Sequence, residues 1–329
     1  MSSTATAAVD GSSPGSQGEA SRSGRAGFVD PQALMRIRSL ELRARVVVEG
    51  FLNGLHRSPY HGFSVEFTEY RPYTPGDDPR YLDWKVLARS DRTFIKKFED
   101  ETNLRCHLLV DRSRSMEFGT VGYSKAEYAV TLAATLAHFL ARQGDAVGLL
   151  SFDETVREYL PARARNGHLR QVMLALEKPA GGRSTDLVAP LEQMARLVRK
   201  RGMLVLISDF LAPLDRLEAT LATLAAAGHE AAIFQVLDPA ETTLDFPTST
   251  MFEDMESART LYADPAAARA GYVERFNAHA AALRALCARH GIAFMRLLTS
   301  QPLDLALLEF LQRREKPGRG GRMAAGGAA

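Results

Sequence analysis

From about residue 104 onward, short apolar runs alternate with longer segments in which apolar residues recur every three or four positions. The short runs have the pattern of strands buried on both faces of a sheet, and the longer segments have the period of amphipathic helices. This alternation predicts the fold class α/β, with a doubly wound, mostly parallel sheet covered on both faces. Expected strands are 106–111, 146–153, 202–210, 229–238 and 292–298, with a short strand at 155–160; expected helices are 124–144, 168–178, 185–200, 213–228 and 272–291.

Upstream of residue 104 the pattern changes to one helix over 31–54, strand-like alternation around Phe63, Val65 and Phe67, and a second strand at 93–98. A smaller α+β segment is therefore expected ahead of the main domain. The two chain ends lack large apolar residues and cannot offset the entropy lost on ordering. The expected organisation is a disordered tail at 1–27, the α+β segment at 30–103, the α/β domain at 104–300 with a hairpin insertion at about 240–265, a C-terminal helix at 301–314 and a disordered tail at 315–329.

Composition narrows the class of protein only slightly. The 329 residues are 46% hydrophobic and 24% charged with a formal net charge of +2, so no nucleic-acid partner is indicated. Cys106 and Cys287 stand far apart in apolar surroundings, which favours buried thiols in a reducing compartment over a disulfide or a zinc site. The chain shows no long apolar stretch and no signal-peptide pattern, so we expect a cytoplasmic protein with no membrane insertion.

Oxygen-bearing side chains follow the predicted strands. The first strand of the α/β domain ends in Asp111-x-Ser113-x-Ser115, the loop before a later helix contains Thr185, and the strand 202–210 contains Asp209 near its end. In an open parallel sheet the carboxyl ends of strands share one edge, so these side chains are expected to converge there. Hydroxyl and carboxylate oxygens suit Mg²⁺ or Mn²⁺ and suit zinc poorly, so the sequence predicts a site for such a cation.

Two plainer interpretations stay open for the same residues. Asp and Ser after a strand are ordinary helix-capping residues, and a buried hydrogen-bond network could hold them without any metal. Thr185 and Asp209 at the same predicted edge favour the metal.

Asp111-x-Ser113-x-Ser115 with Thr185 and Asp209 resembles the metal-ion-dependent adhesion site of von Willebrand factor A domains, over residues of about 104–300. The resemblance implies that Ser113, Ser115 and Thr185 coordinate through their hydroxyls, with Asp111 and Asp209 contributing directly or through water. It also implies a Rossmann-type sheet. One departure is Phe210, which stands where that family often has glycine.

The upstream segment YRPYTPGDDPRYLDWKVLARS, followed by LLVDRSRSM, resembles the bacterial "domain of unknown function 58" family. The resemblance implies a partner, a MoxR-type AAA+ ATPase or its client. Two interpretations of the polar residues around Gly76, Asp77 and Asp78 stay open: turn and capping residues paired with arginines, or a docking surface. The positions that carry the pattern are Arg71, Tyr73, Gly76, Asp77, Asp78, Arg80, Asp83, Trp84, Lys85, Ala88 and Arg89.

The sequence contains no phosphate-binding loop, nucleophile elbow or zinc-protease motif. The expected function is therefore an adaptor that binds the Asp or Glu of a partner protein through the metal, without catalysis. The alternative is a Mg²⁺-dependent phosphohydrolase that uses Asp111 as nucleophile at the same edge.

Overall fold

The computed structural model describes residues 29–57, 70–72, 94–96, 104–179, 187–198, 200–246, 248, 250–253 and 260–314. Several expectations lie outside these residues: both tails, the strand around Val65, and most of the segment with Gly76, Asp77 and Asp78. The short strands β1 (Tyr70–Pro72) and β2 (Phe94–Lys96) pair antiparallel in the upstream segment.

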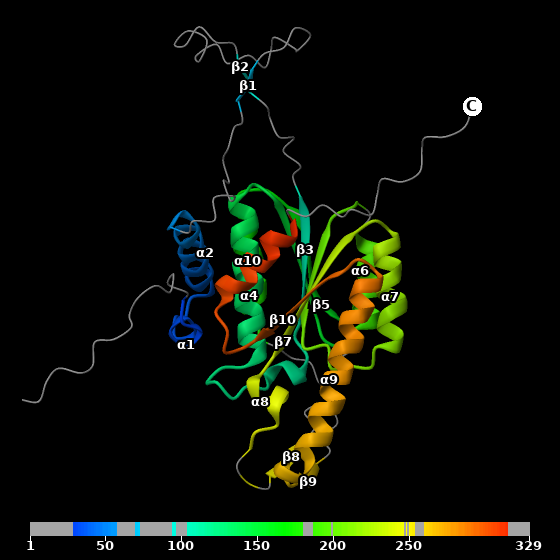
Figure 1. The fold of residues 1–329 in the computed structure, drawn as a ribbon. Helices are drawn as coiled ribbons and strands as arrows, with labels where there is room; N and C mark the ends of the chain where they lie inside the picture. The colour runs from blue at the N-terminus through cyan, green and yellow to red at the C-terminus, as the bar shows by residue number, and fades with distance from the viewer. Residues whose placement is uncertain are drawn as a thin grey trace, which may run out of the picture.

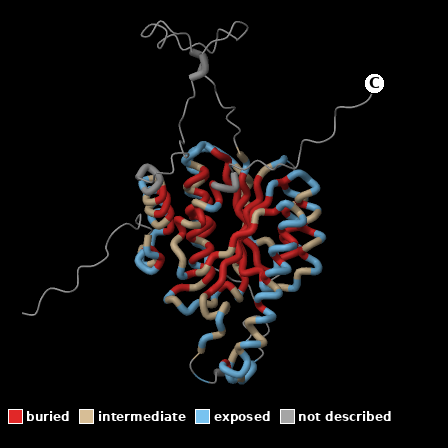
Figure 2. The backbone as a smooth tube through the Cα atoms, in the orientation of Figure 1, coloured by how far each residue is buried: buried red, intermediate tan, exposed pale blue. Residues whose placement is uncertain are grey.

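A six-stranded sheet in the order β10-β7-β6-β3-β4-β5 forms the centre of the molecule. All neighbouring strands are parallel except β5, which pairs antiparallel with β4 at the edge. The central strands are buried along nearly their whole length, as expected for a sheet covered on both faces (Figure 2). The expected α/β class and mostly parallel sheet are confirmed. The strands are β3 (Arg105–Asp111), β4 (Ala146–Phe152), β5 (Val156–Arg163), β6 (Met203–Ser208), β7 (Glu230–Leu237) and β10 (Ala293–Leu298).

Helices cover the two faces of the sheet separately (Figure 1). Successive strand residues point to opposite faces, so Leu108 belongs to one apolar core and Leu109 to the other. The first core includes side chains of α2 (Leu40–Arg57), α4 (Lys125–Arg142), α5 (His168–Glu177) and α10 (Leu303–Arg314). The second includes side chains of α6 (Val188–Leu197), α7 (Asp215–Ala226) and α9 (Pro265–Arg289).

The expectation of one continuous helix over 31–54 is wrong. The chain forms α1 (Pro31–Met35), ends it at Arg36, and begins again at α2. The hydroxyl of Ser39 accepts the backbone N–H of Leu42, which gives the second helix its own N-terminal cap. Helix α2 then packs on α4 within the first core, so it shares the apolar core of the main domain. The division of the chain at residue 104 stays a prediction.

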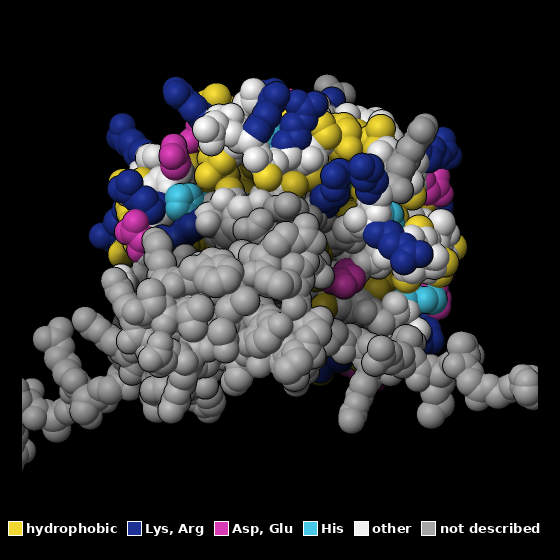
Figure 3. All heavy atoms as spheres, turned by 90° about the horizontal axis from the view of Figure 1, so that it is seen from above, with side chains coloured by type: hydrophobic (Ala, Val, Ile, Leu, Met, Phe, Trp, Pro, Cys, Tyr) yellow, Lys and Arg dark blue, Asp and Glu magenta, His cyan; other side chains and the backbone are white. Residues whose placement is uncertain are grey.

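The segment expected to form a hairpin insertion contains α8 (Pro239–Thr243) and the antiparallel strands β8 (Thr250–Glu253) and β9 (Thr260–Ala263). It projects beyond the carboxyl ends of the parallel strands, next to the start of α9 (Figure 1). At the opposite end of the molecule, Lys and Arg predominate among the charged side chains in view (Figure 3). Among the helices within the described ranges, none combines the length and apolar character needed to cross a bilayer.

Candidate metal site and the adjoining pocket

The carboxyl ends of β3 and β6 bring the candidate site together. These strands are neighbours in the sheet, with Val110 opposite Ile207, and Asp111 and Asp209 stand at their ends. Helix α4, which follows β3, packs in the first core, whereas α7, which follows β6, packs in the second. The chain therefore reverses its winding between these two strands, which is where open α/β sheets bind ligands.

Asp111 is fully buried and accepts two hydrogen bonds at this point. The backbone N–H of Ser113 donates to Oδ1 at 2.8 Å, and the hydroxyl of Ser208 donates to Oδ2 at 2.6 Å. Burial, and after it the negative charge of Asp209, raises the pKa of Asp111 to about 7 despite these bonds. The described hydrogen bonds therefore offset only part of the cost of burying a negative charge at Asp111.

The loop after β3 places the two serines beside this carboxylate. Ser113 is buried and Ser115 half-buried, with their hydroxyl oxygens 3.2 Å apart. The guanidinium of Arg112 fastens the loop to the end of α5 by donating to the backbone carbonyls of Leu176 and Lys178. Arg112 therefore fixes the position of the turn that carries Ser113 and Ser115.

Lys125 is a part of the site that sequence reasoning missed. Its side chain is completely buried, and Nζ donates to Asp209 Oδ2 at 2.8 Å and to Glu241 Oε1 at 2.5 Å. Burial lowers the pKa of Lys125, but the two carboxylates outweigh it and leave the pKa raised, so the ammonium is charged. The sequence offers one signal of this role. Lys125 directly follows the N-cap Ser124, and the dipole of a helix disfavours a cation at its N-terminus unless nearby carboxylates compensate.

The structure brings together Asp111, Ser113, Ser115 and Asp209, while Thr185 lies outside the described residues. Two adjacent ligands of an octahedral Mg²⁺, each at about 2.1 Å, lie about 3 Å apart, close to the spacing of the serine hydroxyls. The spacing of the two serine hydroxyls, which hydrogen-bond to each other, is compatible with two adjacent ligands of a hard divalent cation. Within the described ranges no group of three or more His, Cys, Asp and Glu could hold a metal, so hydroxyls would have to supply part of the shell.

Phe210 has an unusual backbone conformation beside this site. Its φ is 53°, in the left-handed region that favours glycine, although its side chain is fully buried in the second core. The ring of His279 hydrogen-bonds to the Phe210 carbonyl at 2.7 Å, and the side-chain amide of Gln235 donates to the Asp209 carbonyl at 3.0 Å. These two hydrogen bonds hold the backbone at Asp209 and Phe210 in place and offset the strain of the positive φ at Phe210.

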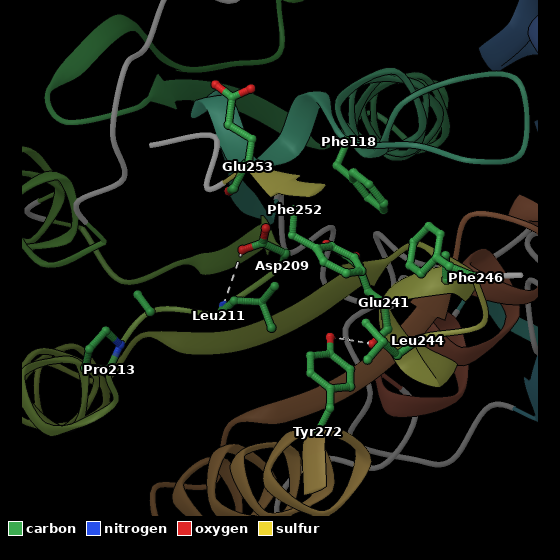
Figure 4. Close-up of a pocket in the computed structure, with 13 residues that line it drawn as sticks. Phe118, Asp209, Leu211, Pro213, Glu241, Leu244, Phe246, Phe252, Glu253 and Tyr272 are labelled. Atoms are coloured by element: carbon green, nitrogen blue, oxygen red, sulfur yellow. Dashed lines mark hydrogen bonds between the residues drawn. The ribbon is translucent and has the colours of Figure 1, made fainter. Parts of the chain in front are cut away.

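A pocket of about 510 Å³ adjoins the candidate site (Figure 4). Ser115 and Asp209 form its edge toward the candidate metal site, and Glu241 and Glu253 are its other acidic lining residues. Most of its remaining wall is apolar and comes from the loop after β3, the loop after β6, the insertion and α9: Phe118, Leu211, Ala212, Pro213, Ala240, Leu244, Phe246, Phe252 and Tyr272.

The raised pKa of Asp111 predicts a specific dependence of stability on pH. Because the folded-state pKa of about 7 exceeds the ordinary 3.8, the stability linked to this group is fully present below about pH 4 and is lost as pH rises through 7. In EDTA, wild-type stability should fall relative to Asp111→Asn by up to about 1.4 kcal/mol per pH unit in this window. Denaturant unfolding of both proteins at pH 4 to 8 measures the difference.

The comparison with Asp111→Asn is needed because a second group changes the pH dependence of stability in both proteins. Burial is the main cause that lowers the pKa of His107 to about 4, so the stability linked to His107 rises with pH, opposite to that linked to Asp111. A stability difference that stays constant from pH 4 to 8 would contradict the raised pKa of Asp111.

Comparisons with known proteins match most of this chain. The model of the family described as "Protein of unknown function DUF58" matches residues 69–282. The uncharacterized protein Rv1480 of Mycobacterium tuberculosis is 31% identical over 293 residues, covering 87% of this chain and 91% of that protein.

Two solved structures show similarity in fold at low sequence identity. An aerotolerance-related membrane protein from Bacteroides fragilis is 16% identical, covers 64% of this chain and 99% of that chain, and has a TM-score of 0.45. The SpRpn10 VWA domain is 13% identical, covers 62% of this chain and 94% of that chain, and has a TM-score of 0.38. At these scores neither similarity carries a conclusion about the fold family or the function of this chain.

Proposed function

The chain belongs to the DUF58 family, and from that premise we propose that its von Willebrand factor A-like domain is a cytoplasmic, metal-dependent protein-binding module. A Mg²⁺ or Mn²⁺ ion at the end of β3 would bind a carboxylate of a partner protein. The proposed partner is a MoxR-type AAA+ ATPase or its client, an identity that comes from the family resemblance alone.

The observation that carries the proposal is the convergence of two hydroxyls and two carboxylates at the point where the sheet reverses its winding. Ser113 and Ser115 would hold the cation through their hydroxyls. Asp111 orients the turn through the Ser113 N–H, and its negative charge, together with that of Asp209, favours a cation at this point. Thr185 stays a predicted ligand, and a bound divalent cation supplies an open coordination position for the partner's carboxylate.

Lys125 restricts how Asp209 can take part. One oxygen of Asp209 is already bound to the ammonium, and the other accepts the backbone N–H of Leu211 at 3.3 Å. Asp209 would therefore act on the cation mainly through its charge or through a bridging water. Among the described residues, this arrangement leaves the two serine hydroxyls as the proposed direct ligands.

Metal binding is expected to depend on the serine pair. Calorimetric titration of the full chain with MgCl₂ or MnCl₂ should show one site, and Ser113→Ala should weaken binding at least about tenfold because it removes a direct ligand. Ser300→Ala, at an exposed serine outside the site, should bind as the wild type does. Equal affinities in all three proteins would contradict the proposed site.

The alternative phosphohydrolase is disfavoured by the surroundings of Asp111. Both carboxylate oxygens accept hydrogen bonds, and the side chain is fully buried. A nucleophilic carboxylate must be ionised and accessible to the phosphorus atom. Turnover of para-nitrophenyl phosphate that needs Mg²⁺ and disappears in Asp111→Asn would support the alternative.

A further inference from the structure

The pocket beside the candidate metal site is enclosed mainly by aromatic and aliphatic side chains. Phe118 comes from the loop after β3, Phe252 from β8 and Tyr272 from α9 (Figure 4). We propose that this pocket receives a large apolar side chain of the partner protein, from a residue close in sequence to the Asp or Glu that binds the metal. The apolar ligand is inferred from the pocket itself, whereas its place beside a metal-binding carboxylate rests on the proposed function.

Two of the acidic lining residues already have hydrogen-bond donors on every carboxylate oxygen. Asp209 accepts from Lys125 Nζ at 2.8 Å and from the backbone N–H of Leu211 at 3.3 Å. Glu241 accepts from the same ammonium at 2.5 Å and from the backbone N–H of Asp238 at 2.9 Å. Neither carboxylate therefore offers an unpaired oxygen to a ligand, and an apolar side chain can enter without breaking these bonds.

The third acidic lining residue, Glu253, directs its carboxylate away from the aromatic wall. In the antiparallel pair of β8 and β9, Phe252 lies opposite Leu261, and Glu253 lies opposite Thr260. Successive strand residues point to opposite faces, so Phe252 and Leu261 share one face of the hairpin and Glu253 belongs to the other. Figure 4 shows the Phe252 ring and the Glu253 carboxylate on opposite sides of the strand. The insertion therefore turns an apolar face toward the pocket.

The aromatic walls are held by their own contacts. Phe246 and Phe252 pack edge to face with ring centroids 5.4 Å apart. Tyr272 stacks on Phe276 at 5.9 Å, and its hydroxyl donates to the Glu241 carbonyl at 2.7 Å (Figure 4). Because these walls are already ordered, they lose little conformational freedom when a ligand binds.

The surroundings of the pocket favour a side chain of a protein over a free small molecule. Leu211 lines the pocket and is 40% exposed, and Leu261 on the pocket face of the hairpin is 66% exposed. Apolar surface thus continues outside the pocket, where neighbouring residues of a partner chain would cover it. Ser115 and Asp209 belong both to the pocket and to the candidate metal site, so a chain that offers a carboxylate to the metal brings its adjacent residues to the pocket.

The first part of the test uses the full ¹⁵N-labelled chain in EDTA and follows NMR chemical shifts during titration with capped amino acids. Nα-acetyl-phenylalanine methylamide should bind at the pocket at least about tenfold more tightly than its glycine and arginine analogues, because only phenylalanine removes a large apolar surface from water without burying a charge. Arginine binding as tightly as phenylalanine, or no binding of phenylalanine, would overturn the proposal.

A pair of neutral variants checks the location. Leu211→Gln should weaken phenylalanine binding at least about fivefold, because it places a polar amide in the apolar wall. Leu174→Gln, at a 54% exposed position on α5 outside the pocket, should leave binding unchanged. Equal effects of the two variants would overturn the assignment to this pocket. Self-association of the chain that Leu211→Gln removes would identify the occupant as a second copy and overturn the assignment to a different partner.

The second part tests the link to the metal with capped glycine peptides that carry one Glu and one Phe, in either order and separated by up to two glycines. At least one peptide should bind at least about tenfold more tightly in MgCl₂ than in EDTA, and replacing its Phe with Gly should cost at least about tenfold, because both groups bind at once. If calorimetry shows metal binding but no peptide gains from Mg²⁺, this inference is overturned and the metal site stands. If calorimetry shows no metal binding, the proposed function fails and the link to a metal-binding carboxylate fails with it.

Discussion

Replacing Lys125 with methionine is expected to lower the free energy of unfolding by about 3–5 kcal/mol. Methionine fills a similar volume, but it leaves the carboxylates of Asp209 and Glu241 buried or half-buried without their shared cation. An uncompensated buried charge is far more costly than the loss of an exposed ion pair. Chemical denaturation of the wild type and the variant at pH 7 measures the difference.

The chain provides a matched control in Lys178, whose Nζ lies 2.5 Å from Glu158 but whose side chain is 62% exposed. Lys178→Met should change stability by less than about 1 kcal/mol, because solvent screens an exposed pair. Adding Glu241→Gln to Lys125→Met should recover part of the loss, since it removes one uncompensated carboxylate. Similar small effects of Lys125→Met and Lys178→Met would show that the buried ion pairs contribute little.

Phe210 is expected to show an unusual order of substitution costs. Phe210→Ala should destabilise the protein by about 3–5 kcal/mol, because it empties a fully buried aromatic site. Phe210→Gly should be less harmful than Phe210→Ala by up to about 1–2 kcal/mol, since glycine adopts the positive φ of this position without strain. Denaturant unfolding of the two variants gives the comparison.

Phe234 is the matched control, because it is also fully buried and lies within β7. There Phe234→Gly should be more destabilising than Phe234→Ala, as in ordinary strand backbone. The same order at both positions would mean that the backbone at Phe210 relaxes when the ring is removed.

The main architecture can be predicted from the sequence because each kind of buried element has a recognisable pattern of apolar residues: continuous in the strands and every three or four positions in the helices. Near-continuous apolar runs such as 106–111 and 146–153 indicated strands covered on both faces, and the sheet contains them in parallel as predicted. The same rule predicts that Asp111 and Asp209 lie together, because the carboxyl ends of neighbouring parallel strands share one edge.

The N-terminal helix shows where periodicity alone was insufficient. The apolar positions over 31–54 suit one helix, but the cap at Ser39 starts a second helix that packs on α4. A local capping bond and contacts with a distant helix decided the outcome, and neither is visible in the spacing of apolar residues.

The candidate site also contains residues that the sequence could place and contacts that it could not. The proximity of Asp111, Ser113, Ser115 and Asp209 could be predicted from the sequence, because each stands at or just after the end of a recognisable strand. Lys125 could not be placed, since it meets Asp209 and Glu241 at sequence separations of 84 and 116 residues. The sequence by itself determined the sheet and the candidate ligands, through local period and strand direction. Only the tertiary structure decided the buried ion pairs, the positive φ of Phe210 and the adjoining pocket, because each depends on how distant loops pack against one another.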